Sequence, residues 1–153
     1  MIDVVTAESD QPLSYDQKEQ INASAYHLKE QSGDSGYAHL SALLKAKLAI
    51  DANNLDQAIT ELEWVVANDP ADDLLTLTKL RLAKVHAAQG DAEKALATIN
   101  NQQAGKMASA YEDAKGDFHI MLGHYEAAYT AYQAAIDTEE TGNSRVISIL
   151  RLK

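Results

Sequence analysis

Histidines and carboxylates are the residues of this chain whose chemistry could serve a metal site or acid–base catalysis. The sequence holds 5 histidines and 23 acidic residues. His119 and His124 lie five positions apart across Gly123, whereas a zinc site on one helix takes histidines four positions apart. The acidic pairs 72–73 and 139–140 are typical of helix ends, and nothing beside them indicates the pocket that an acid–base pair needs. We therefore predict no catalytic residue, no metal site and no cofactor.

Other chemical motifs are missing from the sequence as well. Cysteine is absent, so the chain has no thiol nucleophile, zinc–thiolate site or disulfide framework. Neither a glycine-rich phosphate loop nor a nucleophile elbow occurs. The net charge of −10 removes any overall attraction to nucleic acid and to an acidic membrane surface. These observations favour a protein that is not an enzyme and that binds other proteins.

Two features are candidates for a protein-binding surface. Trp64 is the one tryptophan and could be an exposed hot spot, although we favour packing between repeats as its role. A basic cluster holds 5 of the 13 basic residues. It consists of Lys45, Lys47, Lys79, Arg81 and Lys84. Two interpretations of this cluster stay open: ordinary solvated helix faces, or a local site for carboxylates.

A repeated pattern determines how these residues are positioned. Three stretches share a turn pair, an alanine five residues after its first member and a bulky apolar residue four after that. They are residues 53–62, 90–99 and 123–132. Ala58, Ala95 and Ala128 fall 37 and then 33 residues apart, close to the tetratricopeptide period of about 34 residues. We expect these alanines at helix crossings, where a small side chain is needed.

The pattern predicts an all-α fold, a tetratricopeptide-like right-handed solenoid of about three helical hairpins. An N-terminal helix precedes the hairpins, and a C-terminal helix caps them. The expected helices span about 14–31, 37–52, 55–66, 72–88, 92–99, 107–122, 124–137 and 145–153. Asp69 before Pro70 is expected to start the fourth, and Thr141–Ser144 to break the chain before the cap. We assign residues 1–13 to a mobile lead-in or linker and 14–153 to the tetratricopeptide-like domain.

Several strings resemble one family beyond the repeat itself. They are KEQSGDSGYAHLSALLKAKLAI (29–50), NNLDQAITELEWVVAN (53–68), LTKLRLAKVHAAQGDAEKALATI (77–99) and ASAYEDAKGDFHIMLGHYEAAYTAYQAAI (108–136). They resemble the YfgM family, bacterial inner-membrane proteins with one N-terminal anchor and a tetratricopeptide-like domain in the periplasm. The resemblance implies an ancillary subunit of the SecYEG translocon that works with periplasmic chaperones on emerging chains. It also implies a place at the periplasmic face of the inner membrane, with the anchor upstream of this chain.

A cytosolic tetratricopeptide adaptor that binds a peptide C-terminus in its concave groove is the alternative. Repeats with a carboxylate clamp resemble one another in a lysine at position 5 and asparagines at positions 9 and 6 of successive first helices. In this chain those positions hold Leu43, Lys47 and Arg81. Because no clamp asparagine is present, this alternative weakens.

The concave side of such a stack is lined by positions 2, 5, 9 and 12 of each first helix. In this chain they are Leu40, Leu43, Lys47 and Ile50, then Leu77, Leu80, Lys84 and Ala87, then Ala110, Asp113, Asp117 and Ile120. The candidate partner-binding residues are Leu40, Leu43, Lys47, Leu77, Leu80, Arg81 and Lys84. Leucines flanked by cations suit an amphipathic helix. Its source stays open between a foreign partner and the chain's own helix 14–31.

Overall fold

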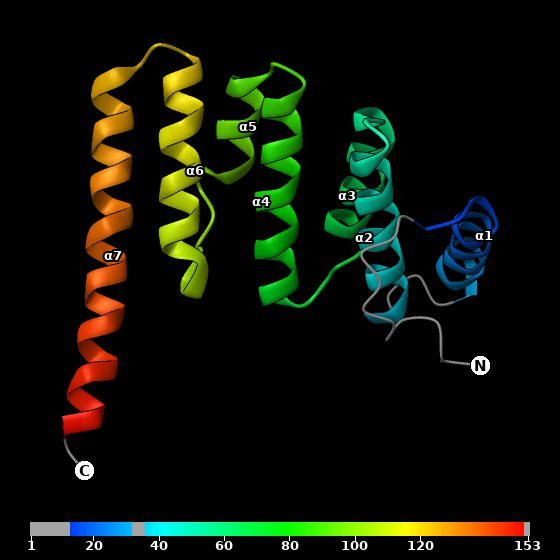
Figure 1. The fold of residues 1–153 in the computed structure, drawn as a ribbon, viewed down its shortest axis with the longest axis horizontal. Helices are drawn as coiled ribbons and strands as arrows, with labels where there is room; N and C mark the ends of the chain where they lie inside the picture. Colours follow the sequence, from blue (N-terminus) through cyan, green and yellow to red (C-terminus); the bar gives the residue numbers. More distant parts are fainter. Residues whose placement is uncertain (1–12, 32–35, 152–153) are drawn as a thin grey trace.

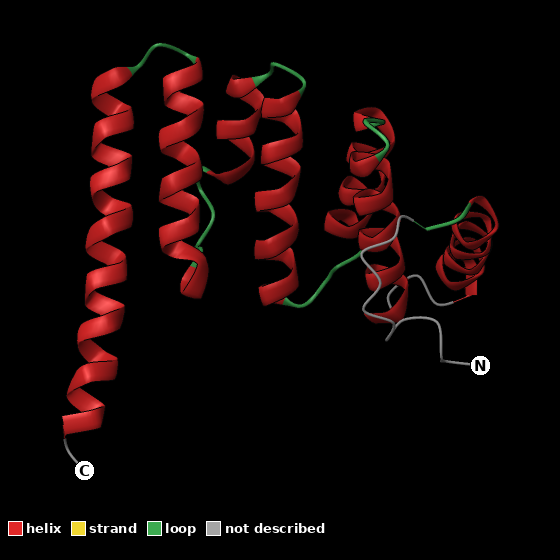
Figure 2. Cartoon of the chain, viewed as in Figure 1, coloured by secondary structure: helices red, strands yellow, loops and turns green. Residues whose placement is uncertain are grey.

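The fold is a single row of helices stacked in chain order (Figure 1). The structure is a computed structural model, and it describes residues 13–31 and 36–151. Within these ranges every long regular element is an α-helix, and no strand occurs (Figure 2). The predicted all-α solenoid is therefore confirmed. Apart from Leu13, the predicted lead-in 1–13 lies outside the described residues, and the domain boundary stays a prediction.

Three hairpins follow an N-terminal helix, as the repeat predicts. The elements are α1 (Tyr15–Gln31), α2 (Gly36–Asp51), α3 (Leu55–Ala67), α4 (Asp72–Ala88), α5 (Ala92–Ile99), the short 3-10 helix η1 (Gly105–Met107), α6 (Ala108–Met121) and α7 (Tyr125–Arg151). Helices α2 and α3, α4 and α5, and α6 and α7 pair with each other. Helices α1 and α7 lie at opposite ends of the row (Figure 1).

All three hairpins turn through the same hydrogen-bonded motif. The residues at the turn, Asn53, Gly90 and Gly123, have φ angles of 56°, 91° and 74°, the left-handed conformation that glycine and asparagine adopt most easily. In each turn the next residue's N–H donates to a carbonyl five residues back, at 2.7 to 3.0 Å. These bonds satisfy carbonyls that a helix end otherwise leaves unpaired. The turn pairs marked in the sequence are therefore the places where the hairpins turn.

The repeat alanines lie where helices cross. Ala58, Ala95 and Ala128 are 0%, 0% and 1% exposed, as predicted. One buried cluster joins α2, α3 and α4, and a second joins α4, α5 and α6. Because α4 contributes Leu82 and Val85 to the first cluster and Leu80 to the second, it links the repeats.

The start of α4 differs from the sequence prediction. Asp69 does not cap this helix: Ala71 is the N-cap residue, and no side chain caps the helix. Asp69 instead has a φ of 50°, and its neighbour Pro70 is buried. Because a residue before proline is kept out of the right-handed helical conformation, the helix begins after the proline. The chain turns at Asp69 through a positive φ, which aspartate adopts more readily than most residues.

The C-terminal end also corrects a prediction. Residues 141–144 do not break the chain, and no separate capping helix 145–153 exists within the described residues, because α7 runs without interruption from Tyr125 to Arg151. The segment contains no proline, and a glycine costs a helix interior only about 1 kcal/mol. The Thr141 hydroxyl donates to the Asp137 carbonyl at 2.8 Å, as in a continuing helix. The last part of α7 extends past the end of α6 (Figure 1).

Candidate protein-binding site

The seven candidate residues occupy three different environments. Leu43 and Leu80 are buried in the core, and Leu77 is half-buried. Leu40 is exposed to solvent, as are the charged residues of the set. Those charged residues are Lys47 on α2 and Arg81 and Lys84 on α4, and we name them the groove cations. The candidate residues are thus leucines that are buried or half-buried, apart from Leu40, and cations that are accessible to solvent.

A hollow of about 240 Å³ lies between α2 and α4, and we name it the α2–α4 hollow. It is lined by Leu43, Ala46, Lys47 and Ile50 of α2, Leu62 of α3 and Arg81 of α4. Three of the candidate residues therefore meet at one place, while Leu40, Leu77, Leu80 and Lys84 do not line the hollow. The candidate set lacked Ala46, Ile50 and Leu62. Leu62 was already marked in the sequence as the bulky residue four positions after the repeat alanine.

The groove cations have few partners within the protein. Lys47 lies 3.8 Å from the Asp51 carboxylate, an exposed pair one helical turn apart, and such pairs add little stability. Among the described residues no carboxylate forms an ion pair with Arg81 or Lys84. These charges are therefore available to a partner, within a chain whose net charge is −10.

The remaining members of the basic cluster serve the fold. Lys45 pairs with the Glu61 carboxylate at 2.7 Å, and Lys79 donates to the side-chain oxygen of Gln102 at 2.6 Å. Both lysines are half-buried. The basic cluster seen in the sequence is thus two sets of residues, one that stabilises helix contacts and one that faces solvent.

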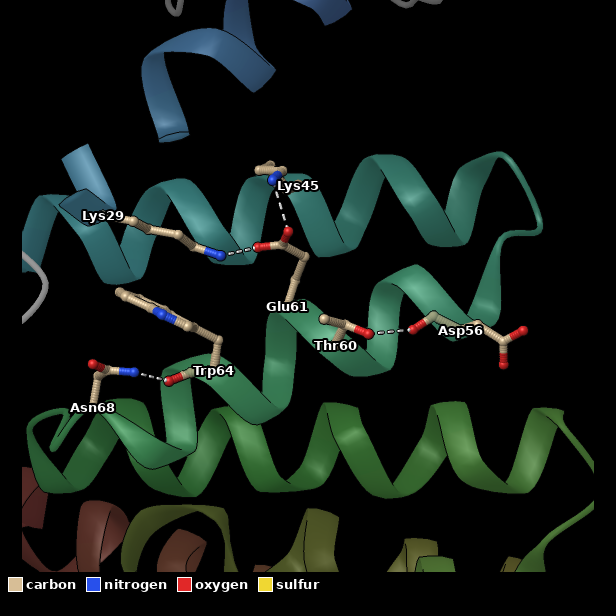
Figure 3. A network of polar contacts seen from close by, with 7 residues as sticks. All are labelled: Lys29, Lys45, Asp56, Thr60, Glu61, Trp64 and Asn68. Atoms are coloured by element: carbon tan, nitrogen blue, oxygen red, sulfur yellow. Dashed lines mark hydrogen bonds and ion pairs between the residues drawn. The ribbon is translucent and has the colours of Figure 1, made fainter. Parts of the chain in front are cut away.

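Helix α1 packs on the other side of α2, around Glu61 (Figure 3). The Lys29 ammonium of α1 and the Lys45 ammonium of α2 both pair with the Glu61 carboxylate of α3, and we name these three residues the Glu61 latch. Lys29 also lies 4.5 Å from the centre of the Trp64 ring, within the range of a cation–π interaction. Trp64 also lies near His39, with ring centres 5.9 Å apart. Trp64 is half-buried and packs against the core cluster of α2, α3 and α4, which supports the packing role favoured from the sequence over an exposed hot spot.

The position of α1 decides one alternative that the sequence left open. Its residues Lys18 and Asn22 line a separate hollow of about 150 Å³ together with Lys45 and Leu48 of α2. No α1 residue that the structure describes lines the α2–α4 hollow. The interpretation in which helix 14–31 fills the groove is therefore wrong for this part of it.

Two of the histidines, His39 and His86, are buried packing residues. His86 is buried, and burial lowers its pKa, so the neutral ring is favoured. His39 is also buried, with its Nε2 atom 2.8 Å from the Asn68 carbonyl oxygen. The rings of His119 and His124 lie 5.8 Å apart. In the part of the chain that the structure describes, no group of three or more histidines and carboxylates is placed to hold a metal ion.

The third hairpin gives the stack a second charge sign. Asp113 and Asp117 on α6 are exposed, at the repeat positions that hold Leu80 and Lys84 on α4. Asp117 accepts a hydrogen bond from the Tyr132 hydroxyl at 2.6 Å, which raises the pKa of that tyrosine to about 12. The exposed faces of successive first helices therefore change from cationic to anionic along the row.

Among the helices within residues 13–31 and 36–151, none combines the length and the apolar character that crossing a bilayer requires.

Comparison with known proteins identifies related domains. A family model described as "Tetratricopeptide repeat-like domain" matches residues 5–153. A protein of Buchnera aphidicola subsp. Acyrthosiphon pisum (strain APS), named "Ancillary SecYEG translocon subunit", is 26% identical over 116 residues, which are 76% of this chain and 60% of the relative. Proteins of the same name from Escherichia coli (strain K12) and Aggregatibacter actinomycetemcomitans are 27% identical over 105 residues and 28% identical over 115 residues. These two alignments cover 69% and 75% of this chain, and 51% and 56% of the relatives.

These relatives confirm the predicted resemblance to the YfgM family. The chain spans about half to three fifths of the length of the curated relatives that it matches.

Proposed function

Because the chain belongs to the tetratricopeptide repeat-like domain family, we propose that it is a non-enzymatic protein-interaction module of a Sec translocon subunit. The name shared by its relatives, ancillary SecYEG translocon subunit, supports the choice of partner. Repeat stacks of this kind present one extended surface to other proteins. In this proposal that surface lies on α2 and α4.

The groove cations around the α2–α4 hollow are the observation that carries the proposal. Two exposed cations, Lys47 and Arg81, line an apolar hollow, and a third, Lys84, follows Arg81 by three positions on α4, in a chain with a net charge of −10. Charges at the rim of an interface set partner choice and association rate, and the apolar centre supplies buried area. In this proposal the partner surface consists of Leu40, Leu77, Lys47, Arg81 and Lys84, over the buried Leu43 and Leu80.

The cellular setting is the second part of the proposal. We place the domain at the periplasmic face of the bacterial inner membrane, on a subunit with a single membrane anchor. There it would link the translocon to periplasmic chaperones that receive emerging chains. This part rests on the resemblance to the YfgM family and on the names of the relatives.

Affinity capture from solubilised inner membranes tests the proposal. The full-length protein that carries this domain is captured, and co-purified SecY is quantified for the wild type and for the variant Lys47→Glu/Lys84→Glu. We expect recovery to fall about tenfold, because two attractive contacts become repulsive. The matched control is Lys94→Glu/Lys106→Glu, which changes the net charge equally at exposed positions on α5 and η1. Wild-type recovery by the groove variant would place the partner surface elsewhere.

A further inference from the structure

We propose that the α2–α4 hollow takes one bulky apolar side chain of an acidic protein segment, whose carboxylates pair with the groove cations. This inference rests on the proposed function, since it names the kind of segment that the interaction surface would hold. It makes the hollow a selective site rather than a general apolar contact. Its three grounds are the size of the hollow, the chemistry of its rim and the charge order along the stack.

The size of the hollow suits one side chain. An engineered apolar cavity of about 150 Å³ holds a benzene molecule, and pockets for drug-sized ligands run from about 300 to 1,000 Å³. At about 240 Å³, the α2–α4 hollow lies between these values. Four apolar residues line it: Leu43, Ala46, Ile50 and Leu62. An aromatic or branched aliphatic side chain fits both the volume and this lining.

The rim of the hollow is cationic on two sides. Arg81 lines it from α4 and Lys47 from α2. Lys84 follows Arg81 by three positions on the same helix, which places the two side chains on one face. The Arg81 guanidinium forms no ion pair with the described residues, and its planar donors match a carboxylate in two parallel hydrogen bonds. A carboxylate next to the inserted apolar side chain therefore has a partner on either side.

The charge order along the stack argues for a peptide rather than a phosphate surface. Beyond α4, the exposed residues Asp113 and Asp117 of α6 would repel nucleic acid or an anionic membrane. A protein segment can match both signs, with acidic residues beside α2 and α4 and a basic residue towards α6. We therefore infer the order of the charges along the bound segment as well as its composition.

Fluorescence anisotropy with synthetic peptides tests this inference. The probe is a labelled peptide with one leucine flanked by glutamates and a lysine near one end. Two further probes carry glutamine for each glutamate, or serine for the leucine. We expect the first probe to bind at least about tenfold more tightly than either of the others, and its affinity to fall with added salt.

Arg81→Gln is the decisive protein variant, with Lys106→Gln as its matched control. Arg81→Gln should weaken the glutamate probe about tenfold and leave the glutamine probe unchanged, while both variants keep the wild-type melting temperature. Equal binding of the glutamate and glutamine probes would overturn the inference. So would binding to phosphatidylglycerol vesicles that depends on Arg81. If SecY capture depends on Lys47 and Lys84 but no probe binds, the proposed function stands and this inference alone fails.

Discussion

The two sides of helix α2 use the same residue type in opposite ways. On one side Lys45 is 16% exposed and shares the Glu61 carboxylate, itself 7% exposed, with Lys29 of α1. On the other side Lys47 is 72% exposed and lies near Asp51, which is 61% exposed. Two positions along a helix are enough to move a lysine from the protein interior to its surface. These two lysines therefore differ in their surroundings: Lys45 holds helices together, and Lys47 lies in solvent beside Asp51.

Among the variants that test the difference between the two sides of α2, removing the charge of Glu61 should change the free energy of unfolding most. The variant Glu61→Gln leaves the Lys29 and Lys45 ammonium groups facing each other without a carboxylate. We expect a loss of about 3 kcal/mol in the free energy of unfolding, the low end for a broken buried pair, because both lysines keep some contact with water. Urea denaturation measures it. Glu63→Gln, at an exposed position of the same helix, is the control and should change stability by less than about 0.5 kcal/mol.

An unchanged urea midpoint for Glu61→Gln would mean that the Glu61 latch does not hold α1. Protection of α1 amides from hydrogen exchange gives a second test, since we expect the variant to lose protection in α1 before α2 and α3.

The next largest effect on stability is expected from overpacking the place where α3 crosses α2. Ala58 is fully buried where α3 meets α2, so Ala58→Leu must push the two helices apart. We expect a loss of about 1–3 kcal/mol, measured by thermal or urea denaturation. The same substitution at the exposed Ala97 of α5 should leave stability almost unchanged. If both variants unfold alike, the register of the repeat is wrong.

A buried tyrosine extends the comparison to the next repeat. The Tyr111 hydroxyl of α6 donates to the Thr76 carbonyl of α4 at 2.6 Å, so Tyr111→Phe should cost about 0.5–1.5 kcal/mol. Burial raises the pKa of Tyr111 from 10.0 to about 12. The fold therefore favours the neutral phenol: its contribution is complete below pH 10 and falls as pH rises from 10 to about 12, where the unfolded chain ionises first.

Stability of the wild type and of Tyr111→Phe between pH 9 and about 12 measures this contribution. The variant should lose less stability over that range than the wild type does. Parallel curves would show that Tyr111 ionises as easily in the folded protein as in the unfolded chain.

The smallest expected effect lies on the open side of α2. Lys47→Gln removes only an exposed charge beside Asp51, so the free energy of unfolding should change by less than about 0.5 kcal/mol. A urea titration alongside Glu61→Gln shows the contrast directly. A loss comparable to that of the Glu61 variant would mean that both sides of α2 serve the fold, and the distinction between them would fail.

The elements of the fold were predictable because their signals are local. Turn residues such as Gly90 indicate where helices end, and repeat alanines such as Ala95 indicate where helices cross, each within a few positions. The continuation of α7 through residues 141–144 was not predictable. Weak helix formers break a helix only where tertiary contacts favour another conformation, and the sequence does not show those contacts. The sequence also placed the groove cations on the correct first helices, α2 and α4.

What the sequence could not supply was the division of charged residues between interior and surface. Glu61 is buried because Lys29 and Lys45 reach it from 32 and 16 positions away, and no local pattern announces such pairs. The α2–α4 hollow likewise depends on how far α2 stands from α4, which packing alone decides.

Site-specific photocrosslinking tests most directly the claim that the open side of α2 and α4 meets the translocon. A photoreactive phenylalanine derivative is placed at Lys84 in one sample and at Lys106 in another, in the full-length protein within its membrane. Both positions are exposed, so neither should disturb folding. We predict crosslinks to a translocon subunit from position 84 and none from position 106. Crosslinks from position 106 with none from position 84 would contradict the account.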